Sequence, residues 1–396
     1  MKKIIFIANV DCGEGMSGGS QIYFELMKRF GNSFQLYFFG SLGTINRLKQ
    51  ENIKNVTYIQ TDDHDDPDLH SIGGAFIHST RRLIKGMQSI YNNSKIIVDA
   101  DFIYSVSDFL PDVIPALFAK WKNPKIKWIS AFYFFAPKPW QKHNPYATSL
   151  MRRAMGICYW FIQSFVYLVI KNYANLVVSC NELDNKVFIR DGFSERKIIA
   201  IYGGVDLNII NAVPVPKKIL YDAVFMARFH PQKGPIVAVK AWKELIKTFP
   251  KARLAMIGNG SEEKEIAVYI KKNGLSNNIR LFGFIDGIKK YKILKSSRIF
   301  IHSATYETGG MAVAEGMACG LPVVAFAQEG FKYCYPQGLL GVLPIGDYHK
   351  LAWAIRELLV DDKKYAILKK EALELVTREW DWDKRASFIL EKMNEI

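Results

Sequence analysis

Residues 3–30 read KIIFIANVDCGEGMSGGSQIYFELMKRF, and this stretch decides the expected fold. Its first part, Lys3 to Val10, is apolar and rich in β-branched side chains, which predicts a buried parallel strand. A glycine-rich loop follows, and the apolar residues of 22–30 then recur at helical spacing. A strand, a glycine loop and a helix in this order are typical of a doubly wound α/β sheet.

The alternation of strand and helix continues outward from this stretch. In the first half, further strands are predicted at 34–39, 95–98, 102–106, 127–131 and 175–179, the last of that half. Gly203, Gly204 and the proline-rich residues 213–216 interrupt the pattern. It restarts with strands at 221–226, 252–257, 279–282, 299–302 and 323–326. We therefore expect two Rossmann-like domains, residues 1–208 and 209–378, followed by a C-terminal helix in 379–396.

Composition limits the class of protein. A chain of 396 residues exceeds the size at which a single core stops growing, so two domains are expected. The hydrophobic fraction of 49% and charged fraction of 23% are globular values and exclude a disordered tail. Lys and Arg number 53 against 38 Asp and Glu, a net charge of +15. This excess predicts a partner with phosphates, whether nucleotide, nucleic acid or anionic membrane.

Cysteine usage and the first residues indicate a cytoplasmic protein. The five cysteines are scattered and form no CxxC pair, so neither a disulfide framework nor a zinc site is predicted. The N-terminal apolar run is short and is followed by Asp11 and Glu14, which argues against a signal peptide. The acidic run 62–68 is interpreted as a solvated loop, and no metal site is predicted.

The strongest motif is YETGGMAVAEGMACGLP, residues 306–322. Glu307 and Glu315 bracket a Gly-Gly turn and the start of a predicted helix, which ends at Gly320. The free N–H groups of a helix N-terminus bind anions, and carboxylates beside it accept hydrogen bonds from sugar hydroxyls. One segment can therefore bind both a phosphate and a polyol. The alternative is structural, with Glu315 facing solvent and Glu307 capping the helix.

A second motif, MARFHPQKG at residues 226–234, follows the first strand of the second domain. It places Arg228 and Lys233 in the loop at the carboxyl end of that strand. Arg binds phosphate oxygens as a planar fork and Lys binds them as a point charge, so this pair would neutralise a diphosphate. A basic surface loop is the alternative.

Together the two motifs resemble the family-4-type retaining glycosyltransferases of the GT-B fold. The family's E-G-F-G-x4-E pattern and its following small-residue stretch are matched by Glu307, Gly310, Glu315, Gly320 and residues 322–325. Its Arg-x4-Lys-Gly pattern is matched by Arg228, Lys233 and Gly234. Similar segments at 177–181, 198–206, 255–260 and 281–284 extend the resemblance over nearly the whole chain.

The resemblance implies two Rossmann-like domains facing a central cleft, with the last helix crossing back to the first domain. It implies that Arg228 and Lys233 bind the donor diphosphate, Glu315 the ribose and Glu307 the transferred sugar. Further donor contacts are implied for Thr308, Gly309, Gly310, Met311, Gly258, Phe284, Gly18 and Gly19. The implied reaction is retaining transfer from a nucleotide-sugar, UDP- or GDP-linked, to a glycan or lipid-linked acceptor, without a metal or other cofactor.

The sequence departs from the family pattern in two places. Thr308 and Gly309 stand where the family has Gly-Phe, a position that bears on the choice of donor sugar. The family's His at the end of a strand in the first domain has no counterpart in residues 130–135. Tyr133 is the candidate substitute, and Ser107 is a second acceptor-side candidate.

Other functions agree less well with the sequence. Gly13, Gly15 and Gly18 spell the dinucleotide-binding pattern, but the second strand ends without the acid that binds ribose. A glycine-rich acceptor or phosphate loop explains the same residues. A nucleotide-sugar-binding protein without turnover is the main alternative, and the intact glutamates and cations favour an enzyme. No stripe of interleaved aromatic and basic residues indicates nucleic-acid binding.

Residues 151–174 include the apolar run MGICYWFIQSFVYLVI between Arg152-Arg153 and Lys171. Gln163 and Ser164 interrupt it, which argues against a membrane span. Two interpretations stay open. One is a buried helix, and the other is an in-plane anchor that contacts anionic lipid together with Arg81, Arg82 and Lys85. The second would place the protein peripherally on the inner face of the membrane.

Overall fold

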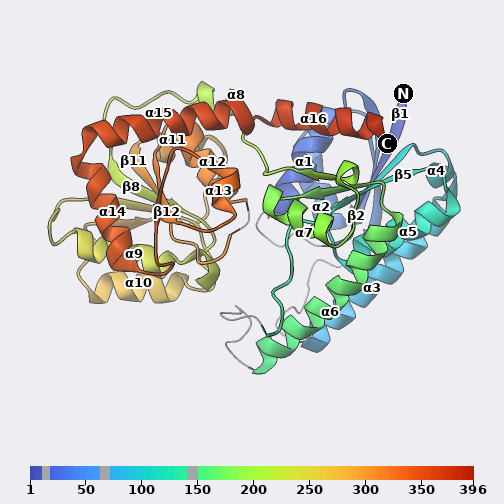
Figure 1. Ribbon diagram of the computed structural model, residues 1–396, viewed down its shortest axis with the longest axis horizontal. Helices are drawn as coiled ribbons and strands as arrows, with labels where there is room; N and C mark the ends of the chain where they lie inside the picture. The colour runs from blue at the N-terminus through green and yellow to red at the C-terminus, as the bar shows by residue number, and fades with distance from the viewer. Residues whose placement is uncertain (11–17, 63–71, 141–149, 308) are drawn as a thin grey trace. The chain divides into compact units, whose positions relative to one another are not determined.

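The computed structural model divides the chain into two compact units, Met1–Gly203 with Ala386–Ile396, and Gly204–Arg385. The structure describes residues 1–10, 18–62, 72–140, 150–307 and 309–396. In each unit, parallel strands carry helices on both faces (Figure 1). The division falls before residue 208 and assigns residues 379–385 to the second unit.

The first unit contains a sheet of seven parallel strands in the order β3-β2-β1-β4-β5-β6-β7. Its elements are β1 (Lys2–Ala8), α1 (Gly18–Phe30), β2 (Phe34–Ser41), α2 (Leu42–Gln50), β3 (Val56–Asp62), α3 (Ile72–Asn92), α4 (Ser94–Val98), β4 (Phe102–Ser105), α5 (Leu110–Lys122), β5 (Lys127–Ala131), α6 (Leu150–Tyr173), β6 (Leu176–Ser179), α7 (Glu182–Arg190), η1 (Glu195–Lys197) and β7 (Ile198–Ala200).

The opening strand is the centre of this sheet. Ile4 to Ala8 of β1 are fully buried, and β1 pairs in parallel with β2 on one side and β4 on the other. A strand covered on both faces must be apolar throughout, which is why the quoted run lacks polar alternation. Helices α3, α5 and α6 lie on the same side of the sheet (Figure 1), and α5 contacts both of the others.

The second unit contains six parallel strands in the order β10-β9-β8-β11-β12-β13. Its elements are α8 (Leu207–Ala212), β8 (Tyr221–Met226), η2 (Pro231–Lys233), α9 (Pro235–Leu245), β9 (Leu254–Ile257), α10 (Glu263–Lys272), β10 (Ile279–Leu281), α11 (Gly287–Lys295), β11 (Ser297–His302), α12 (Met311–Ala318), β12 (Val323–Phe326), α13 (Phe331–Cys334), β13 (Leu339–Val342), α14 (Tyr348–Val360), α15 (Asp362–Glu379) and α16 (Trp382–Glu395), whose last residues belong to the first unit.

Both sheets reverse their strand order at one point, between β1 and β4 in the first and between β8 and β11 in the second. Loops leaving two adjacent strands there turn to opposite faces of the sheet, which opens a crevice at the carboxyl ends of the strands. In the second unit, the loops after β8 and β11 carry the two motifs identified in the sequence. The doubly wound α/β architecture predicted for both halves is therefore confirmed.

Two local predictions were wrong. Residues 95–98 form helix α4 instead of a strand, with the amides of Ile97 and Asp99 donating to the carbonyls of Asn93 and Lys95. A short apolar run does not distinguish a buried strand from a buried helical turn, so local hydrogen bonding decided the outcome. Residues 175–179 were also not the last strand of the first half, because β7 pairs with β6 at the sheet edge.

A segment near the C-terminus of the chain, residues 380–382, packs against the first residues of the second unit. The amide of Val205 donates to the carbonyl of Trp380 at 2.7 Å, and Val205 forms a β-bridge with Asp381. Trp380 and Trp382 are both buried, and a Cβ atom on Gly204 would lie 2.6 Å from the Trp382 ring. Core packing therefore accounts for both tryptophans.

Candidate active site

The loop after β8 is shaped so that Lys233 lies against the end of β11. His230 precedes the short helix η2, and its Nδ1 accepts a hydrogen bond from the amide of Gln232 at 3.3 Å. Gly234 follows with φ of +64°, a left-handed conformation that glycine adopts without strain. A Cβ atom there would lie 2.3 Å from the carbonyl oxygen of Ser303, so only glycine allows the two loops to approach this closely.

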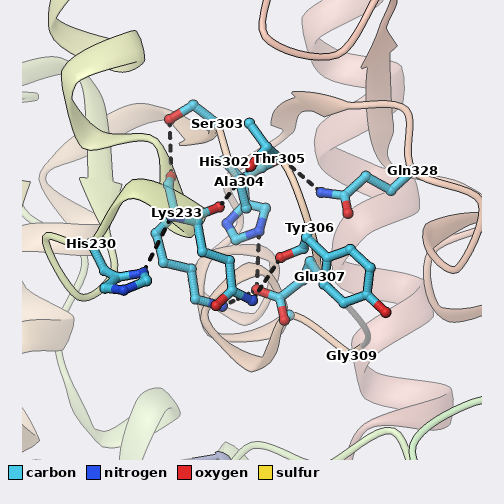
Figure 2. Close-up of polar contacts among 12 residues, drawn as sticks. His230, Lys233, His302, Ser303, Ala304, Thr305, Tyr306, Glu307, Gly309 and Gln328 are labelled. Atoms are coloured by element: carbon cyan, nitrogen blue, oxygen red, sulfur yellow. Dashed lines mark hydrogen bonds and ion pairs between the residues drawn. The ribbon is translucent and has the colours of Figure 1, made fainter. Parts of the chain in front are cut away.

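Hydrogen bonds hold the loop after β11 onto the loop after β8. The Ser303 hydroxyl donates to the carbonyl of Gly234 at 2.7 Å, and the amide of Thr305 donates to that of Gln232 at 2.9 Å. The side-chain amide of Gln232 donates in turn to the carbonyl of Tyr306 at 3.0 Å. Figure 2 shows Ser303, Thr305 and Tyr306 of the loop after β11 beside His230 and Lys233 of the loop after β8. The two motifs therefore form one site.

At the centre of this site, the Lys233 ammonium donates to Oε2 of Glu307 in a largely buried ion pair. His302, the last residue of β11, places its Nε2 3.4 Å from the same carboxylate oxygen (Figure 2). Burial alone would raise the pKa of Glu307. The charge of Lys233 and the contact with His302 outweigh burial and hold that pKa well below its ordinary value. Glu307 is therefore an anion at any physiological pH.

His302 is a site residue that sequence reasoning missed. Its side chain is almost completely buried, and its ring lies 5.4 Å from the Phe331 ring, centroid to centroid. Burial lowers the pKa of the imidazole, although Glu307 acts in the opposite direction, so the ring is neutral near pH 7. The available signal was its place as the final residue of a strand beside the reversal of strand order.

The N-terminus of α12 adjoins this cluster. Gly310 precedes the helix in a left-handed conformation, with φ of +60°. The Tyr335 hydroxyl donates to the carbonyl of Gly309 at 2.9 Å and of Gly310 at 2.8 Å, and the Tyr335 ring stacks on Trp380. A Cβ atom on Gly310 would lie 3.0 Å from the Phe331 ring and 3.4 Å from Cγ of Glu307, so the glycine lets the turn pack closely on the Phe331 ring.

Glu315 lies in a second charged cluster, on the buried side of α12. Its Oε1 accepts from the Lys290 ammonium at 2.7 Å and from the Tyr291 hydroxyl at 3.1 Å, both on α11. Burial would lower the pKa of Lys290, but Glu315 and the neighbouring Tyr291 and Asp286 raise it above its ordinary value. Glu315 is buried, so the structural alternative, in which Glu315 faces solvent, is excluded. The lysine-rich pattern of α11 gave no sign that Lys290 would be buried.

The remaining predicted donor residues of the second unit are distributed around these loops. Arg228 is exposed two residues after β8, and it forms no ion pair within the described part of the chain. Gly258 follows β9 and lies against the backbone of Ala227, and its amide donates to the carbonyl of Gly283 at 2.9 Å. Phe284 is exposed, and Met311 is the first residue of α12. Thr308 lies outside the described residues.

The predicted acceptor-side residues belong to the first unit. The hydroxyls of Tyr133 and Tyr104 lie 2.9 Å apart, and Ser107 donates to the buried carboxylate of Asp112. Burial raises the pKa of Asp112 to about 7. Gly18 and Gly19 open helix α1 after the glycine loop. Gly13 and Gly15 of the dinucleotide-type pattern lie outside the described residues.

A buried carboxylate, which sequence reasoning missed, lies beside these residues. Oδ2 of Asp108, just past β4, accepts from the side-chain amide of Gln163 on α6 at 2.6 Å. Burial raises the pKa of Asp108 to about 6, although the hydrogen bond from Gln163 acts in the opposite direction. The same Gln163 amide also donates to the carbonyl of Phe134 at 2.7 Å. Helix α6 therefore fixes the segment that follows β5.

Two Rossmann-like units, with a cation, a carboxylate and a helix N-terminus at the second reversal of strand order, define the GT-B class of glycosyltransferase folds. Solved structures agree with this class. The chain aligns over its full length with the full HepE chain of Anabaena in complex with UDP-glucose, with a TM-score of 0.71 and 18% identity. It aligns equally over its full length with a glycosyltransferase of Rickettsia africae, with a TM-score of 0.70.

The sequence of the second unit is similar to a known family. Residues 211–375 match the family described as glycosyl transferases group 1, so most of the second unit is similar to a domain of this family. The phosphatidyl-myo-inositol mannosyltransferase of Mycobacterium leprae is 28% identical over 48% of this chain and 52% of its own length. The poly(glycerol-phosphate) alpha-glucosyltransferase of Bacillus subtilis is 27% identical over 40% of this chain and 24% of its own length. This chain therefore spans about half the length of the mannosyltransferase and about a quarter of the length of the glucosyltransferase.

Proposed function

We propose that this protein is a retaining glycosyltransferase that moves a sugar from a nucleoside-diphosphate sugar to a glycan or lipid-linked acceptor. The observation that carries the proposal is the contact between Lys233 and Glu307 at the reversal of strand order in the second sheet. The bond to be broken joins the sugar to the diphosphate, and a neighbouring cation and ionised carboxylate can act on the diphosphate and on the sugar, respectively. The ammonium stabilises the departing diphosphate, and the carboxylate accepts hydrogen bonds from the sugar.

The diphosphate is bound, in this proposal, by Lys233, Arg228 and the amides at the start of α12. Lys233 has three N–H donors and can contact a phosphate oxygen while keeping its bond to Glu307. Arg228 is exposed in the same loop. The free N–H groups around Gly309, Gly310 and Met311 add the positive end of the helix dipole. These fixed charges stabilise the leaving group without a metal ion.

The nucleoside is bound beside α11 and α12. Glu315 accepts the ribose hydroxyls, and Lys290 already balances the charge of that carboxylate. Neutral hydroxyls can therefore join the cluster without leaving a buried charge unpaired. The loops containing Gly258 and Phe284 contact the base, which we take to be uracil or guanine. Gly18 and Gly19 approach the phosphates from the first unit.

The proposed reaction needs no protein base. The acceptor hydroxyl attacks the face from which the diphosphate leaves, and the departing phosphate oxygen takes its proton, so the anomeric configuration is retained. Tyr133 and Ser107 lie on the acceptor side. The named substrates of the relatives, phosphatidyl-myo-inositol and poly(glycerol phosphate), support a lipid-linked or glycan acceptor. Such acceptors, with the cysteine usage and basic charge, support action in the cytoplasm, peripherally on the inner face of the membrane.

Variants of the central ion pair test this proposal. We expect Lys233→Ala and Glu307→Gln each to lower the rate of sugar transfer or donor hydrolysis by about 100-fold or more, because each removes a charge that acts on the reacting bond. Lys247→Ala and Glu244→Gln provide the matched control, since that pair lies on the surface of the same unit, with its atoms 2.6 Å apart. The control variants should retain activity.

The donor is identified by thermal shift with UDP-, GDP- and ADP-sugars, because a ligand that binds only the folded state raises its stability. NMR of the product reads the anomeric configuration, and assays with EDTA test the metal independence. Donor binding by the wild type with neither transfer nor hydrolysis would instead establish a nucleotide-sugar-binding protein without turnover. Full activity of Lys233→Ala would overturn the assignment of the site.

A further inference from the structure

The solvent face of helix α6 is apolar along its length. Ile157, Phe161, Phe165 and Leu168 follow one another at helical spacing and are 42%, 63%, 54% and 56% exposed. Residues three or four apart lie on the same side of a helix, so the four form a continuous stripe. Such a contiguous exposed stripe is unusual for a soluble surface and indicates an interaction site.

The opposite face of α6 is fixed in the first unit. Val166 and Ile170 are buried in its core, and Gln163 binds Asp108 and the carbonyl of Phe134. By length and composition the helix could cross a membrane, since its most apolar 18 residues have a mean hydropathy of 1.4. Of these residues, 28% are buried in the structure. Crossing a bilayer would require these core contacts to break. The docked helix can instead lie in the plane of a membrane interface.

A second helix of the same unit exposes apolar side chains. On α3, the exposed residues Ile77, Ile84 and Tyr91 repeat every seven positions, and Phe76 adds a further exposed ring. Both α3 and α6 contact α5, and the two helices lie on the same side of the sheet (Figure 1). Two neighbours of one helix therefore contribute to the exposed apolar surface.

Aromatic residues border this surface. Trp140 is 70% exposed and packs edge-on against Trp160 of α6, with ring centroids 5.2 Å apart. Trp121 of α5 is exposed and packs edge-on against Tyr173 at the end of α6. Tryptophan and tyrosine are the side chains that favour the headgroup region of a bilayer, because their rings are amphipathic.

The charges of these helices have one sign. Neither α3 nor α6 contains an aspartate or a glutamate, whereas together they contain Arg81, Arg82, Lys85, Arg152, Arg153 and Lys171. Arg82 is buried and Arg81 pairs with Asp62, but Lys85, Arg152 and Arg153 are exposed. Two apolar helix faces whose own charged residues are all cations are complementary to anionic lipid headgroups above acyl chains.

We propose that the exposed faces of α3 and α6 form a docking surface for an anionic lipid bilayer, with α6 in the interface plane. Phe161 and Phe165 insert among the acyl chains, and the exposed Lys85, Arg152 and Arg153 contact the headgroups. These two helices are thus the surface that would hold the protein at the inner face of the membrane. Only the lipid-linked nature of the acceptor rests on the proposed function. Gln163 joins α6 to Asp108, so the docked helix also borders the acceptor side.

Flotation of the full chain with vesicles tests the docking surface. We expect binding to vesicles of phosphatidylcholine with phosphatidylglycerol, and weaker binding to phosphatidylcholine alone or at high salt. The double variant Phe161→Ser, Phe165→Ser should lower the partition coefficient by about tenfold or more, because two aromatic rings no longer leave water. Lys85→Gln with Arg153→Gln should lower it severalfold on anionic vesicles only.

The matched control is Val268→Ser with Ile367→Ser, two exposed apolar residues of the second unit. It should bind vesicles as the wild type does. Equal binding of all variants, or no binding by the wild type, would overturn the proposal. So would a wild-type dimer in analytical ultracentrifugation that the Phe161→Ser, Phe165→Ser variant turns into a monomer, because the stripe would then contact a second copy. Donor hydrolysis in solution, which needs no vesicle, should be the same in every variant and separates a failure of docking from a failure of the proposed function.

Discussion

At the residue scale, the two sequence motifs define most of the proposed chemistry, and the fold adds residues that neither motif contains. Lys233 and Glu307 were expected to act on the same substrate, and the structure places them in contact. His302 and Lys290 were not expected. They reach Glu307 and Glu315 from a strand end and from a neighbouring helix. Contacts between segments distant in the chain leave no periodic signal in the sequence.

His302 leads to a prediction about positioning and pH. Replacing His302 with Leu removes the ring nitrogen beside Glu307, and we expect kcat to fall roughly tenfold with a smaller change in the donor KM. His302→Gln keeps a donor and should restore most of the rate. A purely structural residue would lower stability without this difference between the two variants. An unchanged kcat in the leucine variant would contradict the positioning role.

The same residue has a signature in stability. Its folded pKa is lowered from 6.5, so the unfolded chain binds more protons as the pH falls below that value. As the pH falls from 6.5 to the lowered pKa, the free energy of unfolding of the wild type therefore decreases. His302→Leu should lack this pH-dependent loss of stability. Urea unfolding at several pH values measures the difference between the two proteins.

At the scale of elements, strands buried on both faces were predicted well, whereas β10 was the one edge strand of the two described sheets that was located. The buried residues of β1, β8 and β12 are apolar, and these strands were located by their composition alone. The edge strand β3 has polar and partly exposed residues and was missed, as was the edge strand β13. The strand predicted at 95–98 is a helical turn. A partly exposed strand lacks the continuous apolar run of a central one, so its sequence resembles a loop.

The close approach of β8 and β9 yields a prediction about stability. Gly258 has φ of +141°, and a Cβ atom there would lie 1.9 Å from the carbonyl oxygen of Ala227. Gly258→Ala should therefore lower the free energy of unfolding by about 2 kcal/mol or more, since both the dihedral angle and the clash oppose it. Gly274→Ala is the control, because Gly274 also has a positive φ but faces open space, with no other atom within 4 Å of its Cβ position. Equal losses in chemical denaturation would exclude a role for the clash.

At the scale of the whole molecule, each unit has a hydrophobic core of its own. One core packs around β8, β9 and β11, and the other around β1, β4 and β5. Separate cores of this size unfold as separate cooperative transitions unless their interface is large and hydrophobic. We therefore expect two transitions in calorimetry of the full chain.

Donor binding should affect these transitions unequally. A UDP- or GDP-sugar at 100 times its Kd stabilises the unit that binds it by about 2.7 kcal/mol. The transition of the unit containing Lys233 should therefore move to higher temperature, by more than that of the other unit, and Lys233→Ala should abolish this movement. A larger shift in the other transition would place the nucleotide in the first unit.

The sequence by itself determined the two doubly wound domains, the cationic loop and the glutamate motif, because buried parallel strands, glycine turns and helix starts are encoded by neighbouring residues. The tertiary structure decided which side chains complete the site and which apolar helix remains exposed. Whether α6 is covered, and whether Lys290 and His302 meet a carboxylate, depends on the packing of segments far apart in the chain. The same apolar run fits a core helix and an interfacial one, and only the positions of its neighbours distinguish the two.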